Sequence, residues 1–246
     1  MKKLFSLLLI LLLIFTLSSC SEFSGNYRVA TQEEIKEAKA KVNDLSNVVD
    51  NQTYELTTTA SGKVQGENIN FKATRIFSYR EDIVEYEFIE VNISFIWFKC
   101  ETWTKDNITY MNSDYKLQGV GSNIKIRGNS MDVYEESGKS LHRSLYNSYA
   151  RLIRIYNIAS FYQMLLDTES KVYLDGSNKI KLEGSYYGTD VIAYFVIDNN
   201  NAYSMRIEVP KFQFNYEEIN HVTELKPTNK KTKFPNESDY RLVTSE

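Results

Sequence analysis

The chain has 246 residues, of which 42% are hydrophobic and 13% aromatic, enough apolar material for the core of one domain. It carries 29 Lys and Arg against 32 Asp and Glu, a net charge of −3. Nucleic-acid binding requires a basic surface, so this mildly acidic balance argues against that class of function.

The N-terminus has three parts in the order of a secretory signal peptide. Lys2 and Lys3 precede an apolar run from Leu4 to Leu17, and the small residues Ser18 and Ser19 follow. As a helix the run would span roughly 21 Å, less than the roughly 30 Å of a bilayer's hydrocarbon core. We therefore expect a cleaved signal and no permanent transmembrane helix.

Leu17-Ser18-Ser19-Cys20 resembles the lipobox of bacterial lipoproteins. The resemblance implies that residues 1–19 are removed and that Cys20 receives acyl chains such as palmitate. Two chains anchor a protein stably where one is marginal. We expect an extracytoplasmic protein held by Cys20 on the outer face of the cell membrane, or in the outer membrane if the host has one. An ordinary signal with a chance cysteine is the alternative.

Acylation of Cys20 would leave Cys100 as the only free thiol, so no intrachain disulfide is expected. Cys100 alternates with Phe98 and Ile96 in a strand-like pattern. This alternation favours a buried core residue over a reactive thiol.

Ser21 to Ala30 is predicted to be a polar linker, so that residues 20–30 form the acylated cysteine and its tether and residues 31–246 form one domain. A helix follows, because Thr31 and Glu34 have the spacing of a capping box. Apolar residues recur after it at helical spacing, namely Ile35, Ala38, Val42, Leu45 and Val49.

From Tyr54 to Met111 the apolar period changes to two, which predicts a meander of antiparallel strands. Turns are expected at residues 66–68, 80–82 and 105–107. Residues 89–100 are apolar at almost every position, which predicts burial on both faces.

Two more helices are predicted, over about 141–156 and 159–166, after a Gly- and Ser-bearing stretch with a short strand at 124–126. The period of two then returns between Val172 and Tyr216, and Pro210 marks a bend or an edge. Asp198 to Asn201 reads as a hairpin turn.

These elements make an α+β domain with a large antiparallel sheet. Nine or ten strands would be about 45 Å wide, whereas three helices cover about 30 Å. The sheet must therefore curl around its helices, meet a partner or hold a ligand.

The order of elements, the lipobox and the ending Lys233-Phe234-Pro235 resemble the LolA/LolB and LppX-like lipoprotein superfamily, from about Thr31 to Pro235. The resemblance implies a curved half-barrel whose concave face is covered by an N-terminal helix and a central helical insertion, and binds lipid. By position, that face would draw on Phe71, Phe77, Tyr86, Phe88, Phe195, Ile207 and Phe214.

Catalytic chemistry has little support. No H-E-x-x-H, G-x-S-x-G or phosphate-binding loop is present, and His142 and His221 are expected at the surface or at caps. The acidic residues Glu81, Asp82, Glu85, Glu87 and Glu90 are expected to form a solvated strand face. We expect no enzyme, no cofactor and no bound metal.

Basic residues of the second helix, Lys139, Arg143, Arg151 and Arg154, are candidates for contact with anionic lipid headgroups, although a merely solvated helix face is the favoured interpretation. Lys230, Lys231 and Lys233 pose the same choice. The sequence thus predicts a membrane-anchored lipoprotein that binds a lipid or acyl chain. The alternative is a non-enzymatic scaffold that docks another envelope protein on its exposed sheet face.

Overall fold

The computed structural model describes residues 22–45, 52–64, 66–78, 82–154, 170–176, 178–186, 188–197, 203–214 and 217–244. The predicted signal segment, Cys20, the helix predicted at 159–166 and the turn at 198–201 lie outside the described residues.

Two meanders and a helical insertion make up the chain. The first meander comprises β2 (Thr53–Val64), β3 (Glu67–Ser78), β4 (Glu85–Ile93), β5 (Ile96–Lys105), β6 (Ile108–Leu117) and β7 (Val120–Asn129). The insertion holds α3 (Ser130–Gly138) and α4 (Leu141–Arg154). The second meander comprises β8 (Lys171–Asp175), β9 (Lys179–Tyr186), β10 (Thr189–Ile197), β11 (Tyr203–Phe214) and β12 (Glu217–Pro227).

Short elements flank the meanders. At the N-terminal side are β1 (Arg28–Val29) and α2 (Gln32–Leu45). At the C-terminal side are the 3-10 turn η1 (Glu237–Asp239) and β13 (Arg241–Leu242). The predicted capping box is confirmed at α2, since the Thr31 amide donates to Glu34 Oε2 at 2.9 Å and the Glu34 amide to Thr31 Oγ1 at 3.4 Å.

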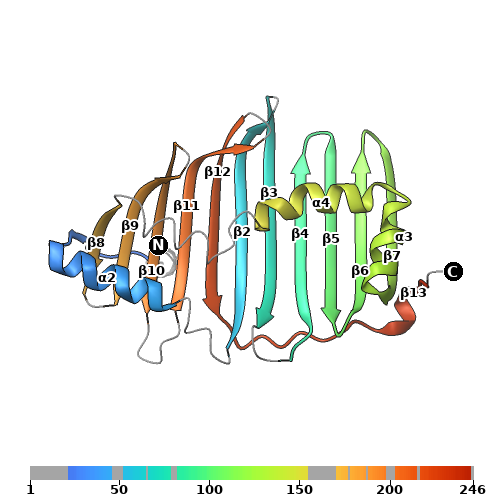
Figure 1. Ribbon diagram of the computed structural model, residues 1–246. Coiled ribbons are helices and arrows are strands. Elements are labelled where there is room, and N and C mark those ends of the chain that lie inside the picture. Colours follow the sequence, from blue (N-terminus) through green and yellow to red (C-terminus); the bar gives the residue numbers. More distant parts are fainter. Residues whose placement is uncertain are drawn as a thin grey trace, which may run out of the picture.

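One curved, unclosed sheet contains all 13 strands, in the order β1-β8-β9-β10-β11-β12-β2-β3-β4-β5-β6-β7-β13 (Figure 1). The pairing of β12 with β2 joins the last strand of the second meander to the first strand of the first. All pairs are antiparallel except β13 with β7. The sheet therefore ends at β1 and β13 instead of closing.

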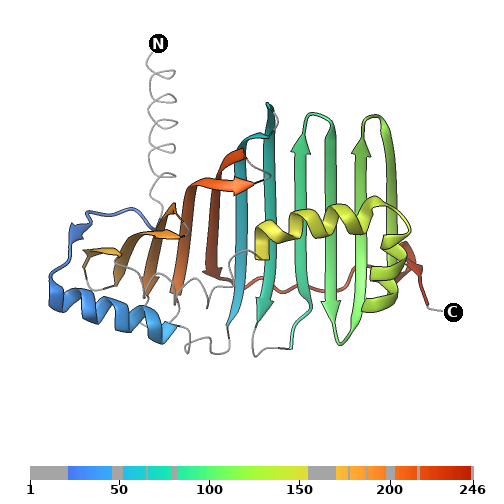
Figure 2. The same ribbon diagram turned by 45° about the horizontal axis from the view of Figure 1, so that its top comes forward.

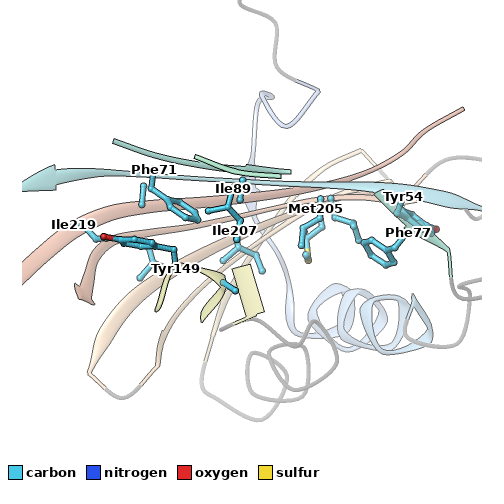
Figure 3. Packing of buried hydrophobic residues seen from close by; sticks show 14 of the residues in the cluster. Tyr54, Phe71, Phe77, Ile89, Tyr149, Met205, Ile207 and Ile219 are labelled. Carbon is cyan, nitrogen blue, oxygen red and sulfur yellow. The ribbon is translucent and has the colours of Figure 1, made fainter. Parts of the chain in front are cut away.

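The helices lie on one side of this sheet, which we call the helix face. In Figure 1, α2 crosses in front of β8–β10 and α4 in front of β3–β6. Residues directly opposite in antiparallel strands share a face, so the register Phe71↔Val91↔Phe98 places these three side chains together on the helix face. Figure 3 shows other members of this layer on the same side of the sheet.

The core spans both meanders. Tyr54 of β2 lies between Phe77 of β3 and Tyr203 of β11, with ring centroids 6.3 and 5.8 Å away. Buried residues of the strands from β8 across the sheet to β7 form one hydrophobic cluster. Val42 of α2 and Tyr149 of α4 also belong to this cluster. The two meanders therefore share one continuous core.

Two local details differ from the sequence prediction, and a third agrees with it. Residues 89–100 form two strands joined by a turn at Ser94–Phe95, and burial alternates along each strand. The sequence did not reveal this turn, because it contains no Gly or Pro. The short strand predicted at 124–126 is the ten-residue β7. Pro210 lies in a β-bulge between Val209 and Phe212, which agrees with the predicted bend.

Candidate ligand-binding face and its cover

The helix face carries most of the predicted ligand residues. Phe71, Phe77, Phe195 and Ile207 all lie there and are buried. The side chain of Phe214 lies outside the described part. The predicted apolar surface therefore exists, and it is covered.

Tyr86 and Phe88 differ from the prediction, since the structure places both on the opposite face. Ile89 belongs to the helix face, and side chains alternate along β4, so residues 86 and 88 point away from it. Tyr86 packs on Trp103, with centroids 5.4 Å apart, and Lys99 lies over the Phe88 ring. Sequence periodicity did not distinguish the faces, because aromatic residues occur on both.

α4 covers the helix face over the first meander with one amphipathic surface. Tyr149 stacks on Phe98 with ring centroids 6.1 Å apart, and Ala150 is buried beside it. Leu145 and Tyr146 pack partly buried against the core. Figure 3 shows Tyr149 entering the same layer as Ile207 and Ile219.

Beneath α4 the interface holds a buried polar cluster. His142 is fully buried, and its Nδ1 shares a hydrogen bond of 2.8 Å with Ser113 Oγ of β6. The Ser113 hydroxyl also contacts the thiol of Cys100, which is buried as predicted. His142 Nε2 is buried and has no hydrogen-bond partner among the described residues.

Burial sets the protonation of this cluster. Loss of solvent raises the pKa of the Cys100 thiol, so it stays protonated and unreactive. Burial also lowers the pKa of His142, which favours the neutral ring. The prediction that His142 and His221 lie at the surface is wrong, since both are fully buried on the helix face.

A polar cavity of about 250 Å³ lies beside α4 at one end of the apolar layer. Tyr146 donates a 2.6 Å hydrogen bond to the Glu87 carboxylate, and Arg75 pairs with Glu85 at 3.0 Å. The other residues that line the cavity are Tyr86, Thr102 and Thr104.

The cavity and the apolar layer occupy the same three strands. Arg75, Glu87 and Thr102 are two residues along their strands from Ala73, Ile89 and Cys100, on the same face. A molecule along this face would meet a polar, charged end and an apolar remainder. The sequence signal was available, because Arg75 and Glu87 break the apolar alternation at matching positions of paired strands.

The predicted acidic run divides between the two faces. Glu85 and Glu87 line the cavity, Glu90 lies on the opposite face, and Asp82 pairs with Lys105 at 3.0 Å. Glu81 lies outside the described residues. The run is therefore not one solvated face.

The predicted basic group is partly engaged within the protein. Lys139 follows α3 and pairs with Glu136 at 2.7 Å, and the Arg143 guanidinium lies 4.8 Å from the centroid of the Tyr134 ring. The side chains of Arg151 and Arg154 lie outside the described part. Lipid contact by this group stays a prediction.

His142 and His221 are not brought together. His142 sits over β6 and His221 lies in β12, five strands apart, or roughly 24 Å at about 4.8 Å per strand. In the described ranges, no group of three or more His, Cys, Asp or Glu side chains is placed to hold a metal ion.

Comparisons with known proteins give little. No family model matches the chain, and no curated protein matches it. A DUF1329 family protein from Desulfovibrio piger is similar over 79% of this chain and 91% of its own, with 14% identity and a TM-score of 0.24. A score this low does not establish a shared fold, so the architecture rests on this chain's own strands.

Within the described ranges, no helix has the length and hydropathy needed to cross a bilayer.

Proposed function

We propose that this protein is an acylated envelope lipoprotein with a LolA-like half-barrel, anchored through Cys20, that binds an amphipathic lipid on its helix face. The ligand's acyl chain would lie on the apolar layer, and its polar head would occupy the cavity at Arg75, Glu87 and Tyr146. Binding requires α4 to move outward, because the layer beneath it is closed in this conformation.

The proposal rests mainly on one observation, that helices pack over the apolar face of the sheet. A sheet of 13 strands presents one continuous apolar layer, and over β3–β6 single helices cover it instead of a second sheet. Packing one helix against a sheet leaves a cover that can separate as a unit at modest cost. The adjoining polar cavity favours an amphipathic ligand over a wholly apolar one.

Ligand extraction tests the proposal directly. Protein purified from membranes without exchange into excess detergent should retain lipid in native mass spectra, at about one molecule per chain. A protein that consistently carries none, and that does not quench or enhance a fluorescent fatty acid in titration, would exclude this function.

The role of α4 as the moving cover has a matched test. Tyr146→Phe removes the hydrogen bond to the Glu87 carboxylate, a bond to a charged group worth about 1.5 to 3 kcal/mol. We expect a fluorescent fatty acid to bind at least about 5-fold faster. Tyr134→Phe, which removes only a 3.3 Å contact from Asn147 between α3 and α4, should leave the rate unchanged.

Anchoring is tested separately. Cells expressing the full chain should incorporate labelled palmitate into the protein, and Cys20→Ala should abolish both the label and the membrane association. Soluble, unlabelled wild-type protein would contradict the lipoprotein assignment.

A second candidate function is docking of another envelope protein on the opposite face. Phe88, Trp97 and Trp103 lie there half-exposed, and aromatic residues are enriched at protein interfaces. Cross-linking in cells should then capture one envelope protein, and Trp97→Ala should abolish that capture while fatty-acid binding persists.

A further inference from the structure

The stretch predicted to be a free linker is packed against the sheet. Phe23 is only 3% exposed, and its ring lies 6.4 Å from that of Tyr194 on the opposite face of β10. Tyr27 also packs on Tyr194, at 5.9 Å, and its hydroxyl donates to the Phe23 carbonyl at 3.0 Å. The segment Glu22–Tyr27 therefore belongs to the domain.

This segment follows one margin of the opposite face. Glu22 pairs with Lys226 near the end of β12 at 3.6 Å, and Lys179 at the start of β9 donates to the Ser24 carbonyl at 2.7 Å. The Lys226 ammonium also lies 5.1 Å from the centroid of the Phe23 ring. These contacts place Glu22 at β12 and carry the chain outward across β11 and β10.

The C-terminal strap, Thr228–Tyr240, follows the same margin beneath the other meander. Lys230 pairs with Glu55 at 2.5 Å, and Phe234 and Tyr240 pack on Tyr110 with centroids 4.8 and 5.2 Å away. Figures 1 and 2 show this strap passing behind the strands from β12 to β13. Both terminal segments thus line one edge, which we call the terminal margin, and they meet at Lys226.

We infer that the terminal margin is the surface that faces the tethering bilayer, and that the helix face points away from it. This inference rests on the proposed acylation of Cys20. Ser21 and the exposed Glu22 separate Cys20 from the buried Phe23, so the anchor can reach about 11 Å from Phe23, at about 3.5 Å per residue. The tether is far shorter than the roughly 35 Å that a free linker would allow.

The burial of Phe23 on the opposite face argues against the reverse orientation. If the helix face lay on the bilayer, the tether would have to pass around both the sheet and a helix layer about 10 Å thick. While Phe23 stays buried, a reach of about 11 Å does not span both the sheet and the helix layer.

Charge at the terminal margin suits a lipid surface with anionic headgroups. Lys231 and Lys233 of the strap are exposed, and no ion pair holds them within the described part of the chain. Each basic residue near an anionic surface contributes about 1 kcal/mol. Lys139 and Arg143, by contrast, lie with α3 and α4 on the side that points away.

Depth-dependent quenching tests the orientation. Three exposed positions receive a fluorophore on an introduced cysteine: Lys233→Cys at the terminal margin, Val120→Cys at the far hairpin and Ser144→Cys on α4. The buried Cys100 should not label. The acylated proteins are reconstituted in vesicles of three parts phosphatidylcholine to one part phosphatidylglycerol, with a headgroup-attached quencher.

We expect quenching at residue 233 to exceed that at residues 120 and 144 at least 3-fold. A ten-residue strand holds the far hairpin about 33 Å from the terminal margin. Adding Phe23→Ser to each labelled protein should free the tether and bring the three values together. Stronger quenching at residue 144, or equal quenching at all three positions with Phe23 intact, overturns the inference.

Mass spectrometry of the same preparations separates the two proposals. Acylated protein with the wrong orientation refutes only the orientation and leaves the lipoprotein assignment standing. Protein without acyl chains refutes both.

Discussion

His142 shows how one buried side chain can make stability depend on pH. Burial lowers its pKa below the ordinary value of 6.5, so the unfolded chain binds this proton more readily than the folded one. The neutral His142 therefore causes no loss of stability above pH 6.5, and it lowers the free energy of unfolding as the pH falls from there toward the lowered pKa. The largest slope for one proton is about 1.4 kcal/mol per pH unit.

We predict that His142→Phe reduces this loss. Urea unfolding at pH 7.5 and pH 5 should show a smaller drop in the free energy of unfolding for the variant than for the wild type, because phenylalanine does not titrate. An identical drop in both proteins would mean that other groups cause the acid sensitivity.

Single residues also show what periodicity can and cannot reveal. The alternation of Ile96, Phe98 and Cys100 placed the thiol in the core, because the pattern lies within one strand. The burial of His142 depends on Ser113 and on α4, which meet only in the folded chain. No spacing in the sequence announces such a contact.

At the scale of elements, the start of α2 depends on its capping box. The Arg28 guanidinium and the Thr31 amide lower the pKa of Glu34 to about 2. The contribution of Glu34 to the free energy of unfolding is complete above the ordinary carboxyl pKa near 4.3, and it is lost as the pH falls through about 2. The capping interactions of Glu34 should therefore remain formed in mild acid, where most surface ion pairs are lost.

We predict that Glu34→Ala lowers the melting temperature more than Glu33→Ala does. Both residues lie in the first turn of α2, but only Glu34 completes the capping box and pairs with Arg28. Differential scanning calorimetry at pH 7 compares them. Equal melting temperatures would show that α2 needs no cap.

The strap is the second element with a separable contribution. Phe234 packs on Tyr110, a residue of the opposite face that is only 7% exposed. Phe234→Ala should lower the free energy of unfolding by about 1 to 3 kcal/mol and speed tryptic cleavage at Lys231 and Lys233. Ile108→Ala removes a 47% exposed side chain and should change stability by less than about 0.5 kcal/mol. Equal cleavage rates would contradict a docked strap.

At the scale of the whole molecule, the two meanders are joined by the pairing of β12 with β2. Thr58 and Thr223 face each other across this joint and share a buried hydrogen bond of 3.1 Å. Replacing one threonine leaves the other hydroxyl buried without its hydrogen-bond partner. Replacing both threonines with isosteric apolar residues leaves no buried hydroxyl that requires a partner.

We predict that Thr58→Val and Thr223→Val each cost about 1 to 3 kcal/mol and that the double variant costs less than their sum. Chemical unfolding of the four proteins measures the coupling. Additive losses would show that the joint does not depend on this pair. Hydrogen exchange on the double variant should still show both meanders opening together, because the apolar core is continuous.

The sequence by itself determined the local features of this protein. The period-two strands, the capping box at Thr31 and the burial of Cys100 follow from chemistry between residues near in the chain. The tertiary structure alone decided that β12 pairs with β2, that Tyr86 and Phe88 face away from the helices, that a polar cavity forms beside α4, and that Phe23 packs onto the sheet. Alternation shows that a strand has two faces, but which face is covered depends on distant segments that meet only on folding.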